Sequence, residues 1–389
     1  MSPNYDYIIA GAGAAGLSLL WHLSESSLSD RKILLVDRSF GVRSDKSWCF
    51  WDHDHPFSDW SAKQWSRLRV VSNDIVYSES LRQLRYHCLQ SSEFSSRVLS
   101  RAKQSRTIDL LESDIQEFGR VNSLPCVSTD DGTFTAPWIF QSVFPKPGST
   151  RLPTPLSLLQ HFRGWEVETD HNLFDPEEAV LMDLDTLQRG GLTFFYLLPF
   201  TPKRALVEYT LFSAQPLKKR DYDEEIQNYL KRTFDLDDDH YTILRCEEGI
   251  IPMNDETPAD NPIPGILNIG LSGRSAKAST GYAFSRIQRH CKQIVESLET
   301  DRNPPPLSGS PLRFRLYDLL LLYLLKHDVP ASRQIFHQLF SQNSLETVLR
   351  FMDEKTHPGE DLSILASVPP GPFLHAIFQL RHRLKSELF

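Results

Sequence analysis

Three glycines and an aspartate near the N-terminus have the residue types and spacing of a dinucleotide-binding site. Gly11, Gly13 and Gly16 follow a short apolar run at 6–10 in the order G-x-G-x-x-G. In this order the glycines permit a tight turn, a close approach of the backbone to a pyrophosphate, and close packing of a helix on a strand. Asp37 ends a second apolar run, where its carboxylate can accept hydrogen bonds from a ribose diol. The pattern predicts a cofactor that carries a pyrophosphate and a ribose.

A helix is expected at 17–23. Its N-terminus would position the phosphates of the cofactor, because the amide groups at a helix N-terminus face bound phosphates. The residues between and beside the glycines, Ala12, Ala14 and Ala15, are expected to contact the cofactor through their backbone. Arg38 follows the aspartate and is either a neighbour of the adenine or phosphate, or a surface residue.

A carboxyl group in an otherwise apolar strand is the second candidate for chemistry. Glu208 lies in the run at 205–212, and strand alternation places it on the same face as Leu206 and Thr210. If this face is buried, the pKa of the carboxyl group rises and the group keeps its proton. The alternative is an outward-facing, solvated glutamate, and the pattern alone favours that alternative.

The first part of the chain predicts alternating strands and helices. The expected elements are a βαβ unit at 5–40, a strand at 68–78, a mostly helical segment at 84–99, and strands at 107–118, 126–129 and 138–144. Asp131-Gly132 is a plausible hairpin turn.

The second part of the chain predicts consecutive strands rather than alternating strands and helices. Consecutive strands expected at 161–169, 179–185, 192–199 and 204–212 favour an antiparallel sheet. The chain then returns to a strand at 266–270, a loop containing Gly270 and Gly273, and a helix near Gly281, all of which could bring backbone to the cofactor. We therefore predict an α/β fold: a discontinuous Rossmann-type FAD-binding lobe at 1–155 and 246–300, an inserted antiparallel substrate lobe at 156–245, and a helical region at 301–389.

Composition narrows the class of protein. The net charge of −8 over 389 residues does not favour binding of nucleic acid, which requires a positively charged surface. We expect neither a signal peptide nor a spanning helix, since no run reaches about 18 apolar residues. The five cysteines are scattered, which indicates a reducing compartment, and neither they nor the histidines predict a metal site.

Four segments together resemble the lycopene cyclase family of carotenoid biosynthesis. They are the glycine motif, Asp45-Lys-Ser-Trp-Cys-Phe-Trp51, Ala205-Leu-Val-Glu-Tyr-Thr-Leu-Phe212 and Lys277-Ala-Ser-Thr-Gly-Tyr-Ala-Phe284. The resemblance runs over essentially the whole chain. It implies a lycopene β-cyclase, which converts the linear ψ-ends of lycopene into β-ionone rings, giving γ-carotene and β-carotene. Such an enzyme needs reduced FAD, with NAD(P)H as reductant, although the reaction has no net redox change.

The resemblance also assigns residues. Glu208 matches the first glutamate of a family motif and becomes the candidate general acid, while Tyr209 stands where a second glutamate is common. Trp48, Phe50 and Trp51 are expected to line the polyene site and stabilise a carbocation, or to form a plain core cluster. Peripheral contact with the inner face of a membrane is expected, because the substrate is insoluble in water.

Some features leave alternatives open. Arg274 and Pro145 depart from the family pattern, and Lys277 is either a phosphate partner or a solvated side chain. An FAD-dependent monooxygenase or a prenyl reductase of the same fold would act on its substrate by redox chemistry. A non-catalytic carotenoid-binding or flavin-binding protein is the remaining alternative, although such a binder gains nothing from a buried carboxyl.

Overall fold

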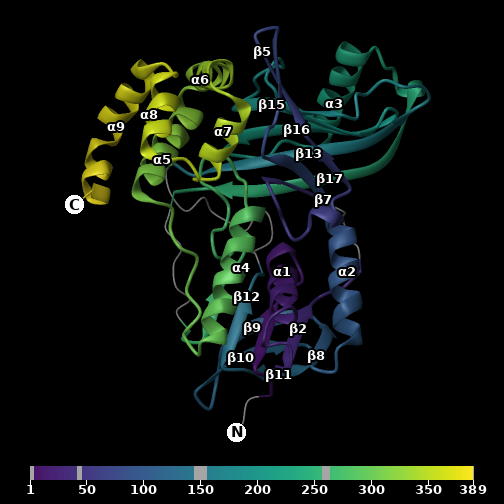
Figure 1. Ribbon diagram of the computed structural model, residues 1–389, viewed down its shortest axis with the longest axis vertical. Helices are drawn as coiled ribbons and strands as arrows, with labels where there is room; N and C mark the ends of the chain where they lie inside the picture. The colour runs from purple at the N-terminus through teal and green to yellow at the C-terminus, as the bar shows by residue number, and fades with distance from the viewer. Residues whose placement is uncertain (1–3, 42–45, 144–155, 256–262, 389) are drawn as a thin grey trace.

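The computed structural model describes residues 4–41, 46–143, 156–255 and 263–388. Pro145 and the Pro/Gly/Ser-rich segment around it lie outside these ranges. The chain forms two sheet-based lobes stacked along the long axis of the molecule, with the C-terminal helices beside the second lobe (Figure 1).

A parallel five-stranded sheet organises the first lobe. Its strand order is β18 (Ile266–Asn268), β12 (Trp138–Gln141), β1 (Tyr7–Ala10), β2 (Ile33–Asp37) and β8 (Ile108–Glu112). Alternate residues of β1 pack in opposite directions, as the pleat of a strand requires. Tyr7 and Ile9 pack against α1 (Ala14–Ser24), α2 (Ser91–Gln104) and α4 (Phe284–Glu299). Ile8 and Ala10 pack against the antiparallel sheet of β9 (Ile115–Val121), β10 (Leu124–Thr129) and β11 (Gly132–Thr135).

A seven-stranded sheet organises the second lobe. Its order is β17 (Tyr241–Met253), β13 (Leu158–Thr169), β16 (Arg204–Ser213), β15 (Leu192–Thr201), β14 (Glu178–Asp183), β5 (Arg67–Ser72) and β6 (Ile75–Ser80). Neighbouring strands are antiparallel except for the parallel pair β14 and β5. The sheet is therefore not confined to residues 156–245, because β5 and β6 come from the N-terminal part of the chain.

Helices cover both faces of this sheet. On one face, α3 (Lys219–Phe234) packs against side chains that include Val207 and Tyr209 of β16. The opposite face, which carries Leu206 and Phe212, belongs to the same apolar cluster as the C-terminal helices. These are α5 (Leu312–His327), α6 (Val329–Gln342), α7 (Leu345–Met352), α8 (Pro358–Ala366) and α9 (Pro370–Leu388).

A small antiparallel sheet joins the two lobes and overturns one prediction. It consists of β3 (Ser47–Asp52), β7 (Arg85–Gln90) and β4 (Lys63–Trp65), in the order β3-β7-β4. In the segment 84–99, predicted to be mostly helical, residues 85–90 form β7 and α2 begins only at Ser91. Pairing of β7 with a strand on each side outweighs the local preference of the segment.

Two other boundaries differ from expectation. The strand predicted at 68–78 is the hairpin β5–β6, whose turn residues Asn73 and Asp74 both have positive φ. Within the helical region predicted at 301–389, α6 ends at Gln342 and α7 begins at Leu345, because Ser344 caps a new helix by accepting a hydrogen bond from the Thr347 amide.

The predicted fold class is confirmed: a Rossmann-type parallel sheet, a second sheet-rich lobe and a helical C-terminal region. No helix in the described ranges is both long enough and apolar enough to cross a membrane. Nor do three or more potential metal-binding side chains converge within the residues that the structure describes.

Candidate active site

The glycine loop after β1 forms a cradle in front of α1. Gly11 has φ +103°, and a Cβ atom there would lie 2.4 Å from the Ser142 Oγ. A Cβ on Gly16 would lie 1.8 Å from the Gly11 carbonyl oxygen, so any larger residue would push the helix off the strand. Around Gly13 no atom lies within 4 Å of the Cβ position, which leaves open space before the helix. The two tight contacts shape the turn, and the open position admits a ligand close to the backbone.

The N-terminus of α1 is suited to an anion. The helix begins at Ala14, has no acidic residue in its first turn, and receives no hydrogen bond from a capping side chain. The backbone amides of Ala14 and Ala15 therefore lie at the positive end of an uncapped helix. A pyrophosphate is the group that such an end of a helix binds in nucleotide-binding folds.

Asp37 lies at the end of β2 beside this loop. One of its oxygens accepts a hydrogen bond from the Ala12 amide at 2.7 Å, and the other accepts one from the Ser39 amide at 3.1 Å. Arg38 follows with an exposed side chain. Next to them is a cavity of about 60 Å³ that sequence reasoning missed, and it is lined by Ala12, Ser39, Phe40, Gly41, Ser91, Ser92, Ser95 and Leu99.

The three later glycines occupy two different places. Gly270, just after β18, lies against the start of α1, since a Cβ there would be 2.7 Å from the Ala15 Cβ. Gly273 lies against the carbonyl oxygen of Asn268. Gly281 instead packs on Gln160 of β13 and lines the cavity described next. The first two belong to the lobe of the parallel sheet, and the third lies against the second lobe.

Glu208 faces an apolar cavity of about 160 Å³ between the seven-stranded sheet and the C-terminal helices. Its side chain is 5% exposed and accepts a hydrogen bond from the Thr210 hydroxyl at 3.2 Å. Burial, with a smaller contribution from the charge of Glu247, raises the pKa of Glu208 well above its usual range. This environment therefore favours the protonated form of the carboxyl group.

Glu247 of β17 is the neighbour that sequence reasoning missed. It is 2% exposed and accepts hydrogen bonds from the Ser47 amide (3.0 Å), the Ser47 hydroxyl (2.9 Å) and the Arg245 guanidinium (2.6 Å). The local sequence does not show whether Glu247 or Glu248 faces inward. Only the register of β17 on β13 distinguishes the two residues.

Of the three predicted aromatic residues, only Trp48 lines the cavity with Glu208. Phe50 lies one layer behind, with its ring stacked on Phe284 at a centroid distance of 4.8 Å. Trp51 is also buried and meets the Tyr282 ring edge-on at 4.6 Å. The structure thus gathers Trp48, Glu208 and Gly281 around one space and places Phe50 and Trp51 in its supporting wall.

Other aromatic side chains complete the lining. They come from β13, β15, β16, the loop before α4, the start of α4, and α6: Phe162, Phe194, Tyr196, Phe212, Tyr282, Phe284, Phe336 and Phe340. The contribution of α6 was not predicted, since its apolar positions at i and i+4 are equally compatible with core packing. Among the described lining residues, Glu208 alone bears an acidic or basic side chain.

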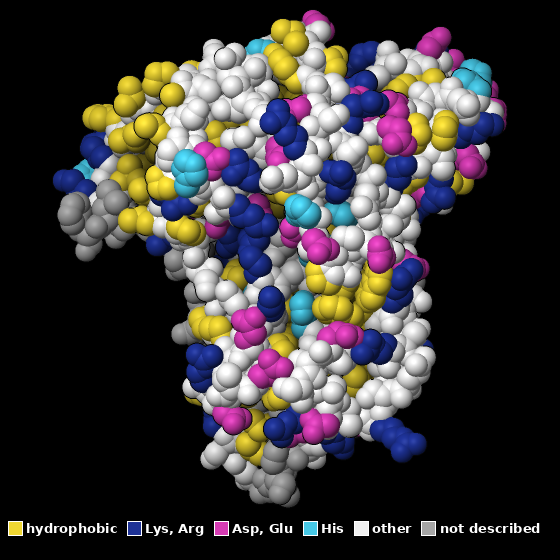
Figure 2. Space-filling model, viewed as in Figure 1, with side chains coloured by type: hydrophobic (Ala, Val, Ile, Leu, Met, Phe, Trp, Pro, Cys, Tyr) yellow, Lys and Arg dark blue, Asp and Glu magenta, His cyan; other side chains and the backbone are white. Residues whose placement is uncertain are grey.

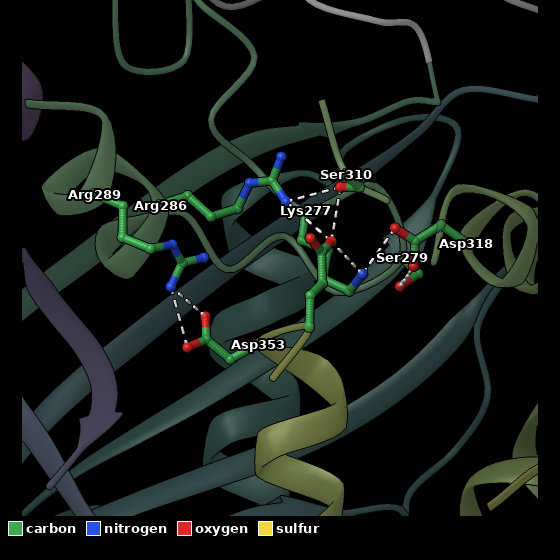
Figure 3. Close-up of polar contacts among 8 residues, drawn as sticks. Lys277, Ser279, Arg286, Arg289, Ser310, Asp318 and Asp353 are labelled. Atoms are coloured by element: carbon green, nitrogen blue, oxygen red, sulfur yellow. Dashed lines mark hydrogen bonds and ion pairs between the residues drawn. The ribbon is translucent and has the colours of Figure 1, made fainter. Parts of the chain in front are cut away.

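Lys277 is neither a phosphate partner nor a solvated side chain, and both sequence interpretations are wrong. Its side chain is 5% exposed, and its ammonium group pairs with Asp318 of α5 at 2.8 Å and with Glu354 at 3.0 Å (Figure 3). Ser279 donates a hydrogen bond to the same Asp318 at 2.6 Å. These contacts fasten the loop that carries Gly281 and Tyr282 to the C-terminal helices, and so fix one wall of the cavity.

A glycine cradle on a parallel sheet, joined to a second sheet that encloses an apolar cavity, defines the fold of the flavoproteins. Solved structures share this fold at low sequence identity. A geranylgeranyl bacteriochlorophyll reductase-like protein from Thermoplasma acidophilum aligns with TM-score 0.62 and 11% identity, covering 97% of this chain and 98% of that one. The halogenase PltM, in a complex with phloroglucinol and FAD, aligns with TM-score 0.58 and 12% identity over 93% and 85%.

The family described as lycopene cyclase protein matches residues 6–379, and the chain belongs to this family. A lycopene β-cyclase from Paracoccus sp. (strain N81106 / MBIC 01143) is 25% identical over 98% of each chain. A lycopene β-cyclase from Pantoea ananas is 24% identical over 67% of this chain and 65% of its own length. The family predicted from the sequence is confirmed.

Proposed function

We propose that this protein is a lycopene β-cyclase in which Glu208 is the general acid. The observation that carries the proposal is the buried carboxyl group of Glu208, the one carboxyl group among the described residues that line the aromatic cavity, with a pKa raised by burial. Membership of the lycopene cyclase family supports the substrate class. A cyclisation through a carbocation requires such an acid, because the reaction begins with protonation of an alkene.

The reaction is balanced without an oxidant or reductant. The proton of Glu208 forms a bond with the terminal double bond of a ψ-end, and the remaining tertiary carbocation is attacked by the next alkene, which closes the ring. Loss of a proton from the ring then leaves the double bond of the β-ionone ring. Rings such as Trp48 and Phe194 stabilise the cation through their faces, by about 2 kcal/mol each when desolvated. The apolar lining also excludes water, which would capture the cation.

We propose that the cradle at Gly11, Gly13 and Gly16 holds FAD. The open backbone at Gly13, the uncapped start of α1 and the carboxylate of Asp37 fit its pyrophosphate and ribose. In its reduced form, with NAD(P)H as reductant, bound FAD would supply negative charge near the developing cation. In this assignment the parallel-sheet lobe binds the cofactor, and the seven-stranded sheet with the C-terminal helices binds the substrate.

We also propose peripheral contact with the inner face of a membrane, where a lipophilic carotenoid is dissolved. Figure 2 shows hydrophobic side chains gathered over the C-terminal helices. Leu362 of α8 and Leu374 and Phe378 of α9 are 61–68% exposed. Arg381 lies over the Phe378 ring at 4.4 Å, which adds positive charge beside the apolar side chains.

Carotenoid profiling tests the central proposal. Lycopene-accumulating bacteria would express the wild type, Glu208→Gln, or the control Glu248→Gln, which changes an exposed glutamate on β17 of the same sheet. We expect β-carotene or γ-carotene from the wild type and the control, and unchanged lycopene from Glu208→Gln. Cyclised product from Glu208→Gln at the wild-type level would exclude Glu208 as the acid. Unchanged lycopene from a folded, flavin-containing wild type would favour a redox enzyme or a non-catalytic binder.

A further inference from the structure

Two buried carboxyl groups meet across a glycine on the cavity face of the seven-stranded sheet. Gly164 of β13 pairs with Glu208 of β16 on one side and with Glu247 of β17 on the other. Directly paired residues of an antiparallel sheet point to the same face, so the three positions form one row. Because Gly164 has no side chain, the two glutamates can approach each other above it. A Cβ on Gly164 would lie 3.2 Å from the Cβ of Glu208 and 3.3 Å from its Cγ.

The hydrogen bonds show which member of the pair is ionised. Glu247 lies close enough to Glu208 to raise the pKa of its carboxyl group, and a hydrogen bond between the two carboxyl groups requires one proton. Glu247 accepts three further hydrogen bonds, two from Ser47 and one from Arg245. Glu208 accepts one, from Thr210. Charged and backbone donors stabilise a carboxylate, so the proton lies on Glu208 and the negative charge on Glu247.

The remaining polar groups around Glu208 do not compete for this proton. Tyr196 of β15 and Tyr282 of the loop before α4 face Glu208, and burial raises the pKa of both phenols above the usual range. Cys49 of β3 forms a hydrogen bond with the Tyr196 hydroxyl at 3.0 Å. The side chains that α6 and α7 contribute to the cavity lining, Phe336, Phe340 and Met352, are uncharged. Arg245 binds two carboxyl groups, because its Nε also donates a hydrogen bond to the buried Glu166 at 2.9 Å.

We propose that Glu208 and Glu247 form a carboxyl pair that carries a single proton, in which Glu247 is a positioning residue for the acid. Glu247 is not among the residues that line the cavity, so it acts through Glu208 rather than on the substrate. This inference rests on the proposed cyclase function. It explains why a carboxylate is buried beside the acid rather than replaced by an apolar residue.

The pair accounts for both proton transfers of the cyclisation. In the first, the Glu208 O–H bond breaks, the proton bonds to the terminal alkene carbon, and the pair becomes doubly negative beside the cation. Attraction between these charges is strong in a cavity without water, and it offsets the repulsion between the two carboxylates. In the second, the ring C–H bond breaks, its electrons form the ring double bond, and the proton returns to the pair. The pair ends with one proton, as it began.

Infrared spectroscopy tests the pair without depending on turnover. The C=O band of protonated Glu208, assigned by its absence in Glu208→Gln, would be followed as a function of pH in the wild type, Glu247→Gln and the control Glu248→Gln. Since the charge of Glu247 opposes ionisation of Glu208, Glu247→Gln should move the midpoint of this titration to lower pH by at least about one unit. Glu248→Gln should leave it unchanged. The alkaline limb of the pH–rate profile should move in the same direction, which a purely structural role of Glu247 would not cause.

A second variant covers the case in which Glu247→Gln does not fold. Gly164→Ala inserts a methyl group between the carboxyl groups and should also lower the midpoint. An unchanged midpoint in either folded variant overturns the pair, as does the absence of a protonated Glu208 band in the wild type at neutral pH. If the band and its shift are present but the wild type does not cyclise lycopene, the pair stands and the proposed function fails.

Discussion

Replacing Glu208 with glutamine should change how the stability of this protein depends on pH. Glutamine keeps the shape of the side chain and can still accept the hydrogen bond from Thr210, but it cannot bind the proton. The carboxyl group of an unfolded chain has a pKa of about 4.3. Burial raises the pKa of Glu208 well above that value in the folded protein.

The sign and size of the effect follow from proton linkage. Between the two pKa values the folded state holds a proton on Glu208 that the unfolded state has lost. The contribution of Glu208 to the free energy of unfolding is therefore complete below the unfolded pKa. This contribution decreases as the pH rises towards the folded pKa. The decrease is about 1.4 kcal/mol of unfolding free energy for each pH unit. Glutamine does not titrate. The free energy of unfolding of Glu208→Gln should therefore rise relative to that of the wild type by this amount for each pH unit.

Urea denaturation at pH 5, 6, 7 and 8 would measure the difference between the two proteins. Contributions from other titrating groups largely cancel in this difference. The control Glu168→Gln, which changes an exposed glutamate of β13, should show no such trend. A difference between the wild type and Glu208→Gln that stays constant with pH would mean that Glu208 is ionised in the folded state, and the argument for a buried acid would fail.

Two further predictions concern the cofactor and the membrane. Asp37→Ala should weaken FAD binding about 10- to 100-fold, as expected for loss of a hydrogen bond to a charged group; fluorescence titration of the apoprotein would measure it, and wild-type affinity would contradict the role of Asp37. Replacing Leu374 and Phe378 together with serine should reduce sedimentation with anionic phospholipid vesicles without lowering the melting temperature, because both side chains are exposed. Equal sedimentation of wild type and variant would exclude this surface as the site of membrane contact.

The glycine cradle could be predicted from the sequence because its tightest contact is local, between the Cβ position of Gly16 and the carbonyl oxygen of Gly11. The spacing of these two glycines therefore indicates the turn. The acid and its partner behave differently. Gly164, Glu208 and Glu247 are brought together only by the register of three strands, which depends on long-range pairing. For the same reason Lys277 could not be assigned, since its partner Asp318 lies on a helix 41 residues further along the chain.

The division of each sheet between distant parts of the chain has a consequence for folding. The seven-stranded sheet needs β5 from residues 67–72 to pair with β14 at 178–183, and the parallel five-stranded sheet needs β12 to pair with β18 more than a hundred residues later. Neither lobe can be completed before the chain has crossed between them several times. We therefore expect the two lobes to fold slowly and together, since pairing of strands far apart in sequence delays folding. A fragment cut at either lobe boundary would lack strands of both sheets.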